Sequence, residues 1–146
     1  MDNQQTITLP TIALDQGAVD EFTARLRGRL LRPGDNDYDA ARRVWNAMVD
    51  KRPALIVQCA GAADVVAAVR FATEHDLLVS IRGGGHGVAG LAVCDDGLMI
   101  DLSRMKGIRV DPVAKTARAE AGVLWGEFDQ ETQAFGLATV GGVVST

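Results

Sequence analysis

The sequence has 146 residues, which is enough for one domain with a sizeable hydrophobic core and too few for two ordinary domains. Hydrophobic residues make up 47% of the chain and charged residues 23%, which is typical of a water-soluble globular protein. The net charge of −4 at pH 7 disfavours a nucleic-acid-binding surface, and the apolar runs are too short to cross a bilayer, so we expect neither nucleic acid nor membrane as a partner.

The first part of the chain is predicted to be a polar arm followed by two helices. Residues 1–10 are polar, and a helix capped by Asp15 carries apolar residues at helical spacing until the turn-forming residues 32–35. A second, short helix follows with one apolar face. The apolar side chains expected on these helices are Val19, Phe22, Leu26 and Leu30 on the first, and Tyr38, Ala41, Val44, Trp45 and Met48 on the second.

A strand–helix–strand unit is predicted next. Residues 54–57 form a short buried strand, residues 61–75 a helix and residues 77–81 a second strand. Asp64 lies in the first turn of the helix, where a carboxylate favours the helix dipole. The stripe expected to face the core is Val65, Val69 and Ala72. Such a unit implies a right-handed crossover and parallel pairing of its two strands.

The remaining elements are a strand, a hairpin and a helix. Residues 98–102 are predicted as the strand, residues 108–111 and 116–119 as the hairpin, and residues 125–135 as a helix stopped by Gly136. The chain then ends inside a glycine-rich passage, from which we expect it to be the N-terminal portion of a longer chain. The predicted fold class is α+β, with a small parallel sheet and flanking helices followed by the start of a mixed or antiparallel part.

Cysteine usage and the N-terminal residues indicate a reduced, cytoplasmic protein. Cys59 and Cys94 form no CxxC pair and have no His at metal-ligand spacing, so we expect two buried, reduced thiols and no metal site. Residues 1–15 lack the basic and apolar regions of a signal peptide, so a cytoplasmic location is expected. His75 is expected to act as a cation at the end of a helix rather than as a functional base.

The glycine-rich stretch of residues 82–90 is the most informative feature. It reads Arg82-Gly83-Gly84-Gly85-His86-Gly87-Val88-Ala89-Gly90 and begins at the end of a predicted strand, where open α/β sheets tend to bind ligands. Successive glycines allow consecutive backbone N–H groups to converge on phosphate oxygens, and the absence of Cβ atoms lets the backbone approach a bulky diphosphate. We therefore predict a phosphate-binding loop, with a tight surface turn as the alternative.

Two common nucleotide-binding motifs do not fit this stretch. Residues 85–90 match the GxGxxG pattern literally, but a Rossmann site needs a helix that starts in the loop. The few residues before Gly97 leave no room for such a helix. The sequence also contains no GxxxxGK[ST] motif, which excludes a P-loop.

From residue 53 onward the sequence resembles the FAD-binding domain of the vanillyl-alcohol oxidase superfamily, also called the PCMH-type fold. It is most similar to the berberine-bridge-enzyme-like oxidases of bacteria. The matching segments are residues 54–71, the loop of residues 81–90, the IDLSRMK-like residues 98–105 and the Ala-Gly-Val-Leu-Trp run of residues 121–125. The resemblance implies an N-terminal arm and helical lead-in over residues 1–52 and an incomplete FAD-binding domain over residues 53–146.

The resemblance implies FAD as the cofactor. In the family the glycine-rich loop wraps the FAD diphosphate, and its histidine, here His86, commonly bonds covalently to the 8α-methyl group of the flavin. A non-covalent contact of His86 is the alternative. Some members have a second bond through a Cys, but residues 136–146 contain none, so we expect one bond. The residues implied to bind the cofactor are Arg82, Gly83, Gly84, Gly85, His86, Gly87, Val88, Gly90, Gly142 and Ser145.

The implied activity is that of an FAD-dependent oxidoreductase that takes a hydride from an alcohol, sugar or similar CH–OH substrate. The family's substrate domain and catalytic base lie beyond residue 146, so no catalytic residue is predicted and this chain alone is expected to be inactive. Its expected partners are FAD, a small-molecule substrate and the C-terminal part of the same enzyme. Two alternatives remain: a non-catalytic FAD- or nucleotide-binding fragment, and an enzyme of the same superfamily with non-covalent FAD.

Two further features are expected to be structural. Asp101 and Arg104 could form an exposed ion pair after the strand of residues 98–102, and such pairs contribute little. Trp125 and Phe128 are expected in the hydrophobic core rather than as a stacking platform for a ligand. We predict no catalytic role for any of these four residues.

Overall fold

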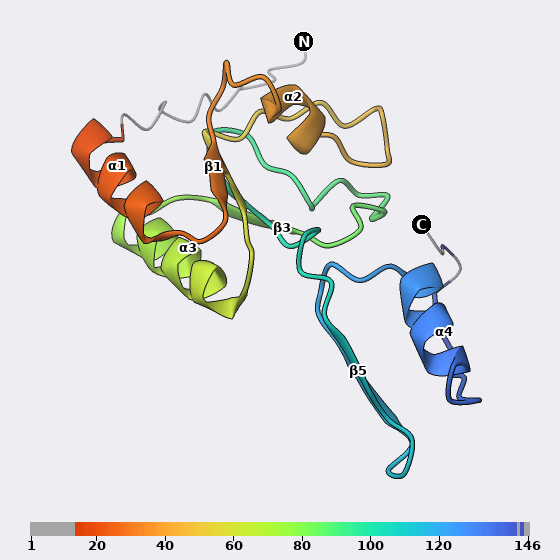
Figure 1. Ribbon diagram of the computed structural model, residues 1–146. Helices are drawn as coiled ribbons and strands as arrows, with labels where there is room; N and C mark the ends of the chain where they lie inside the picture. The colour runs from red at the N-terminus through yellow and green to blue at the C-terminus, as the bar shows by residue number, and fades with distance from the viewer. Residues whose placement is uncertain (1–13, 143, 145–146) are drawn as a thin grey trace.

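A mixed four-stranded sheet forms the centre of the computed structural model, which describes residues 14–142 and residue 144 (Figure 1). The helices are α1 (Gln16–Arg25), α2 (Tyr38–Ala41), α3 (Ala62–Glu74) and α4 (Trp125–Gln133). The strands are β1 (Arg29–Leu31), β2 (Leu55–Gln58), β3 (Val79–Arg82), β4 (Leu98–Asp101), β5 (Ile108–Asp111) and β6 (Thr116–Ala119). The α+β class predicted from the sequence is confirmed.

The sheet has the strand order β1-β2-β4-β3, with β2, β4 and β3 parallel and β1 antiparallel to β2. The predicted direct pairing of the two strands that flank α3 is therefore wrong, because β4 lies between β2 and β3. All four residues of β4 are buried, as expected for a central strand covered on both faces. Exposed and buried residues alternate along β3, which suits the edge of the sheet.

Each face of the sheet has its own hydrophobic core, because side chains alternate between the faces along each strand. Helices α1 and α3 cover one face, where the rings of Phe22 and Phe71 stack with centroids 4.2 Å apart. Helix α2 covers the other face, and the Tyr38 hydroxyl donates to the Pro53 carbonyl at 2.6 Å. Buried members of the first core include Leu55, Val57, Leu98 and Ile100, and the second contains Leu31, Tyr38, Ala41, Ile56, Val93 and Met99.

The first predicted helix is shorter than its apolar spacing suggests. It ends at Arg25, and Leu30 lies in strand β1 instead of the helix. A close approach of two chain segments accounts for the difference: a Cβ atom on Gly28 would lie 2.0 Å from the carbonyl oxygen of Gln58. The glycine lets the chain run against β2, and the pairing that follows is a non-local contact that helical periodicity does not report.

The second predicted helix is also reduced, to the single turn of α2. Two of the side chains expected on its apolar face are instead exposed, Trp45 by 66% and Met48 by 93%. The chain after Ala41 makes hydrogen bonds to a distant loop, since the Trp45 N–H donates to the Gly85 carbonyl at 3.0 Å. This tertiary hydrogen bond takes the place of the helical hydrogen bond that the Trp45 N–H would otherwise make.

Helix α3 forms as predicted, but its buried face differs from the predicted stripe. Val69 is 47% exposed, and the buried residues are Asp64, Ala68, Phe71 and Ala72. The Asp64 carboxylate accepts three backbone N–H groups, from Arg27 at 2.9 Å, Gly28 at 3.0 Å and Ala60 at 2.8 Å. Burial raises the pKa of Asp64, but these hydrogen bonds outweigh burial and hold the pKa below its usual value. Asp64 thus joins two turns rather than only favouring the helix dipole.

The hairpin β5–β6 and helix α4 have the predicted positions and project away from the four-stranded sheet (Figure 1). Helix α4 is followed by Gly136, whose φ of +67° suits a helix stop. The thiols of Cys59 and Cys94 are free and buried, as predicted. Within residues 14–142 and residue 144, no helix is long and apolar enough to cross a membrane.

Replacing Asp64 with Ala removes the acceptor of three backbone N–H groups. Hydrogen bonds to a charged group contribute about 1.5–3 kcal/mol each and are not additive, so we expect the free energy of unfolding to fall by about 2–4 kcal/mol in urea titrations. Asp15→Ala is the matched control, because Asp15 is an exposed helix N-cap that accepts only the Ala18 N–H, and losing such a cap costs about 1 kcal/mol. Equal losses in the two variants would contradict the role of Asp64.

Candidate functional site

The glycine-rich loop of residues 83–90 starts where β3 ends, at the edge of the sheet where all three parallel strands have their carboxyl ends. Ligands of open α/β sheets bind at this edge. The register places Gln58, Asp101 and Arg82, the last residues of β2, β4 and β3, directly beside one another. Their side chains therefore form a polar row beneath the start of the loop.

Asp101 is the centre of this polar row and is fully buried. Its carboxylate accepts from Arg82 through Nη2 at 2.6 Å and Nε at 3.2 Å, from Gln58 Nε2 at 3.2 Å and from the Ser103 N–H at 3.0 Å. Burial raises the pKa of Asp101, but the bonds from Arg82 and Ser103 more than offset burial, so the pKa lies below its usual value. A buried carboxylate with this set of donors remains ionised at neutral pH.

The partner of Asp101 is not the one predicted from the sequence. Asp101 pairs with Arg82 inside the protein, whereas Arg104 is exposed. Sequence spacing favoured Arg104, three residues away. The actual partner, Arg82, lies on the adjacent strand β3, and the register of the sheet brings it close to Asp101. The third arm of Arg82, Nη1, donates to the Arg43 carbonyl at 3.0 Å. All three guanidinium nitrogens thus bond to protein groups, and the predicted contact of Arg82 with the cofactor remains a prediction.

The loop itself exposes main-chain donors. Gly85 has φ of +72°, a conformation that side-chain-bearing residues rarely adopt. Gly90 has φ of +67°, and a Cβ atom there would lie 2.5 Å from a methyl group of Val49. In the part of the chain that the structure describes, no backbone carbonyl accepts a hydrogen bond from the N–H groups of residues 83–89. Gly85 is buried, whereas Gly84, Gly87, Val88 and Ala89 are exposed, so the N–H groups of these four residues are available to phosphate oxygens or water.

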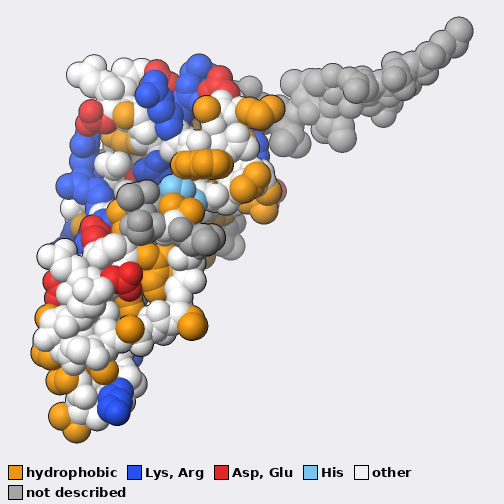
Figure 2. Space-filling model, turned by 90° about the vertical axis from the view of Figure 1, so that its right-hand side faces the viewer, with side chains coloured by type: hydrophobic (Ala, Val, Ile, Leu, Met, Phe, Trp, Pro, Cys, Tyr) orange, Lys and Arg blue, Asp and Glu red, His pale blue; other side chains and the backbone are white. Residues whose placement is uncertain are grey.

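His86 lies half-buried in the wall of a cavity of about 280 Å³. The lining residues are Gly84, Gly85, His86, Val123, Leu124, Trp125, Gly142 and Val144. On its other side, the His86 imidazole faces the Trp45 ring, with centroids 6.2 Å apart. Figure 2 shows a face on which a histidine lies among hydrophobic side chains, with Arg and Lys side chains gathered above it.

Gly141 and Gly142, near the end of the chain, pack against Trp125, which lines the same cavity. A Cβ atom on Gly141 would lie 2.9 Å from the indole ring, and one on Gly142 would lie 2.9 Å from the indole nitrogen. Trp125 is 36% exposed, so the expectation that it belongs to the core is wrong. Of the predicted site residues, the structure brings Gly142 to the cavity of His86, and Ser145 lies outside the described residues.

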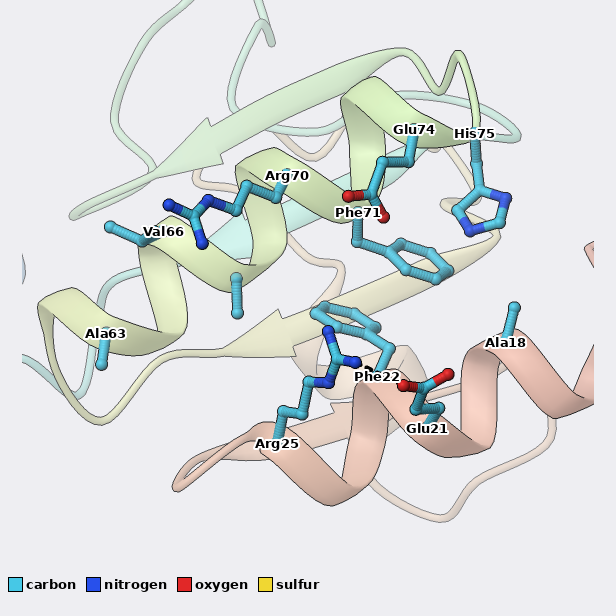
Figure 3. Close-up of a pocket in the computed structure, with 11 residues that line it drawn as sticks. Ala18, Glu21, Phe22, Arg25, Ala63, Val66, Arg70, Phe71, Glu74 and His75 are labelled. Carbon is cyan, nitrogen blue, oxygen red and sulfur yellow. Dashed lines mark hydrogen bonds and ion pairs between the residues drawn. The ribbon is translucent and has the colours of Figure 1, made fainter.

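A separate groove of about 330 Å³ lies between α1 and α3 (Figure 3). The stacked rings of Phe22 and Phe71 form its floor, and its rim carries charged side chains, among them the ion pair of Glu21 and Arg25. The groove is on the face of the sheet opposite to the polar row and includes no residue of the glycine-rich loop. It is the seam between two packed helices and contains none of the residues predicted to bind the cofactor, whereas the cavity beside His86 contains several of them.

The chemistry of the cavity suits part of FAD. Open main-chain N–H groups favour a diphosphate, and no Asp or Glu lines the cavity to repel it. The volume is slightly below the ~300–1,000 Å³ that small-molecule sites occupy. A cavity of this size could hold part of a dinucleotide such as FAD. Within residues 14–142 and residue 144, no cluster of His, Cys, Asp and Glu could hold a metal ion.

Comparisons with known proteins agree with this description. A family model described as "FAD binding domain" matches residues 53–146. The (R)-6-hydroxynicotine oxidase of Paenarthrobacter nicotinovorans is 37% identical over 118 residues, which are 81% of this chain and 26% of the relative. This chain thus spans about a quarter of the length of that relative.

Solved structures give the same result. The 6-hydroxy-D-nicotine oxidase from Arthrobacter nicotinovorans superposes with a TM-score of 0.78 at 38% identity, over 80% of this chain and 26% of that one. The BBE-like 1 protein of Physcomitrella patens gives 0.67 at 29% identity, over 74% and 24%. A chitooligosaccharide oxidase gives 0.71 at 26% identity, over 82% and 26%.

Removing the Asp101 carboxylate leaves the half-buried Arg82 guanidinium without its ion-pair partner. We expect Asp101→Ala to lower the free energy of unfolding by about 3–5 kcal/mol, because breaking one side of a buried pair leaves an uncompensated charge. Lys106→Ala is the control, since the Lys106–Glu127 pair is partly exposed and such pairs contribute at most about 1 kcal/mol. Urea unfolding measures both, and a cost below about 1 kcal/mol for Asp101→Ala would show that the buried pair is dispensable.

The lowered pKa of Asp101 also predicts a pH dependence. A carboxyl group whose pKa is lower in the folded state stabilises the protein above its unfolded pKa, about 3.9, and loses this contribution as the pH falls through the folded pKa. The stability difference between wild type and Asp101→Asn is therefore constant at neutral pH and shrinks below about pH 4. Because Asp64 titrates in both proteins, the difference isolates Asp101. A difference that grows on acidification would contradict this assignment.

Proposed function

The chain belongs to the FAD-binding domain family of the berberine-bridge-enzyme-like oxidoreductases, and we propose that it holds the diphosphate and the flavin of FAD in an FAD-dependent oxidoreductase. The observation that carries the proposal is the loop of residues 83–89, whose N–H groups donate to no backbone carbonyl in the described part of the chain. The loop follows the Asp101–Arg82 pair and contains His86 at the wall of the cavity. A diphosphate is the part of FAD that such donors bind.

The loop binds mainly through its backbone. Main-chain N–H groups donate to the phosphate oxygens, and Gly84 and Gly85 line the cavity with backbone alone. Gly142 and Trp125 line the same cavity and would contact the bound cofactor. Bound FAD supplies the two-electron oxidation of the substrate, while the protein holds and orients it.

We further propose that an imidazole nitrogen of His86 bonds covalently to the 8α carbon of the flavin. The new C–N bond replaces one C–H bond of the 8α-methyl group and the N–H bond of the imidazole, and the two protons and two electrons released are passed on to an electron acceptor such as oxygen. Two observations support this assignment. The imidazole is only half-buried and lines the cavity, so it can reach a bound ring. The Trp45 ring lies 6.2 Å from the imidazole between ring centroids, and Trp125 lines the same cavity as His86, so aromatic side chains surround the position where a flavin ring would bind.

The activity of the whole protein is part of the same proposal. We infer that a longer chain uses this FAD to take a hydride from a small substrate such as an alcohol or a sugar, with a substrate-binding part following residue 146. Relatives named as oxidases of 6-hydroxynicotine and of chitooligosaccharide support oxidation of a small organic molecule. The CH–OH class of substrate is our proposal for this chain.

Acid precipitation tests the covalent bond, because only covalently bound flavin stays with the precipitated protein. For the full-length protein we expect a yellow pellet from wild type and a colourless pellet with yellow supernatant from His86→Ala. His75→Ala is a matched control, since the given sequence has two histidines and His75 ends helix α3 beside Phe71, in the groove between α1 and α3 that includes no residue of the loop. A yellow pellet from His86→Ala would refute the bond, and a colourless wild type that ignores added FAD would refute FAD binding itself.

A further inference from the structure

Segment 43–51 lies against the glycine-rich loop although the family model starts only at residue 53. Three hydrogen bonds and one apolar contact join the two, and a fourth hydrogen bond joins the segment to Arg82, the last residue of β3 before the loop. The bonds run from Arg82 Nη1 to the Arg43 carbonyl (3.0 Å), from the Trp45 N–H to the Gly85 carbonyl (3.0 Å), from Asn46 Nδ2 to the Val88 carbonyl (2.9 Å) and from Lys51 Nζ to the Gly90 carbonyl (3.5 Å). The apolar contact is between Val49 and Gly90.

Every bond that segment 43–51 donates to the loop goes to a carbonyl oxygen. In a planar trans peptide the C=O of one residue and the N–H of the next point in opposite directions. The bond from Trp45 to the Gly85 carbonyl therefore directs the His86 N–H away from segment 43–51. The bond from Asn46 to the Val88 carbonyl does the same for the Ala89 N–H. The segment thus fixes the side of the loop on which its free donors lie.

Asn46 makes the best-defined side-chain contact of this segment. Its Oδ1 accepts the Met48 N–H at 3.1 Å, and its Nδ2 donates to the Val88 carbonyl at 2.9 Å. The planar amide is held at both ends, so it bridges segment 43–51 and the loop rigidly. The Lys51 contact is at the upper limit for a hydrogen bond and comes from a longer, more flexible side chain.

We propose that segment 43–51 is a positioning element of the FAD site, with Asn46 as its central side chain. It holds the loop amides in the orientation that a diphosphate needs before FAD arrives, and this reduces the ordering cost of binding. This inference rests on the proposed function of the loop. It adds residues before the matched FAD-binding region to the cofactor site.

The test measures FAD affinity in the full-length His86→Ala protein, where binding is reversible. We expect Asn46→Ala in this background to raise the FAD dissociation constant about three- to tenfold, the effect of one lost hydrogen bond in a preorganised site. The melting temperature of the FAD-free protein should not change. Asn36→Ala is the matched control, because Asn36 is exposed and lies in a turn before α2, and it should leave the affinity unchanged.

A second measurement uses the protein with His86 intact. Asn46→Ala should slow the rate at which added FAD becomes acid-stable by a similar factor, while Asn36→Ala should not. If Asn46→Ala does not fold, Asn46→Asp keeps the acceptor for the Met48 N–H, replaces the donor to Val88 with a carboxylate oxygen and adds a negative charge. Asn36→Asp is its control, because it adds the same charge at an exposed turn away from the loop. Unchanged affinity and an unchanged incorporation rate would overturn the proposal. Failure of the proposed function looks different, because then wild type and His86→Ala would both ignore FAD.

Discussion

The buried Asp101 carboxylate imposes the constraint on which the candidate site depends. It lies at the end of the central strand, out of contact with water, so its charge needs donors at fixed positions. Arg82 and Gln58 supply them only when the neighbouring strands keep their register with β4. A slip of one residue would turn both side chains to the other face of the sheet and leave a buried charge unpaired. The ion pair therefore fixes register as well as local geometry.

The same ion pair determines where the glycine-rich loop begins. Arg82 is the last residue before the loop, and its third nitrogen bonds to the Arg43 carbonyl. One guanidinium thus connects the sheet, the loop and segment 43–51. The sheet contacts the start of the loop through Arg82, and segment 43–51 binds the carbonyl groups of the loop. The loop also lines the cavity that contains Trp125 and Gly142. Glycines can adopt the required conformations, but these neighbours select one of them.

The sequence predicted the features that depend on local pattern. Helix α3, the hairpin β5–β6 and the glycine-rich loop each follow from periodicity or composition within a short window. Prediction from the sequence failed where distant segments of the chain meet. The approach of Gly28 to β2 ends the first predicted helix, and the hydrogen bond from the Trp45 N–H to the Gly85 carbonyl replaces part of the second predicted helix. The pairing of Asp101 with Arg82 needed the strand order, which placed β4 between β2 and β3 and could not be obtained from spacing.

In the proposed site, the groups that bind FAD and the side chains that position them lie on different parts of the chain. The proposed phosphate donors are backbone N–H groups, which no substitution except one to proline removes. Within the loop, only the His86 side chain is proposed to act chemically. The side chains that determine the loop's shape lie outside it, on β4 at Asp101 and in segment 43–51 at Asn46. Substitutions confined to residues 83–90 would therefore underestimate how strongly side chains control cofactor binding. The contacts that determine the shape of the loop come from Asp101, about 20 residues after the loop begins, and from Asn46, about 40 residues before it.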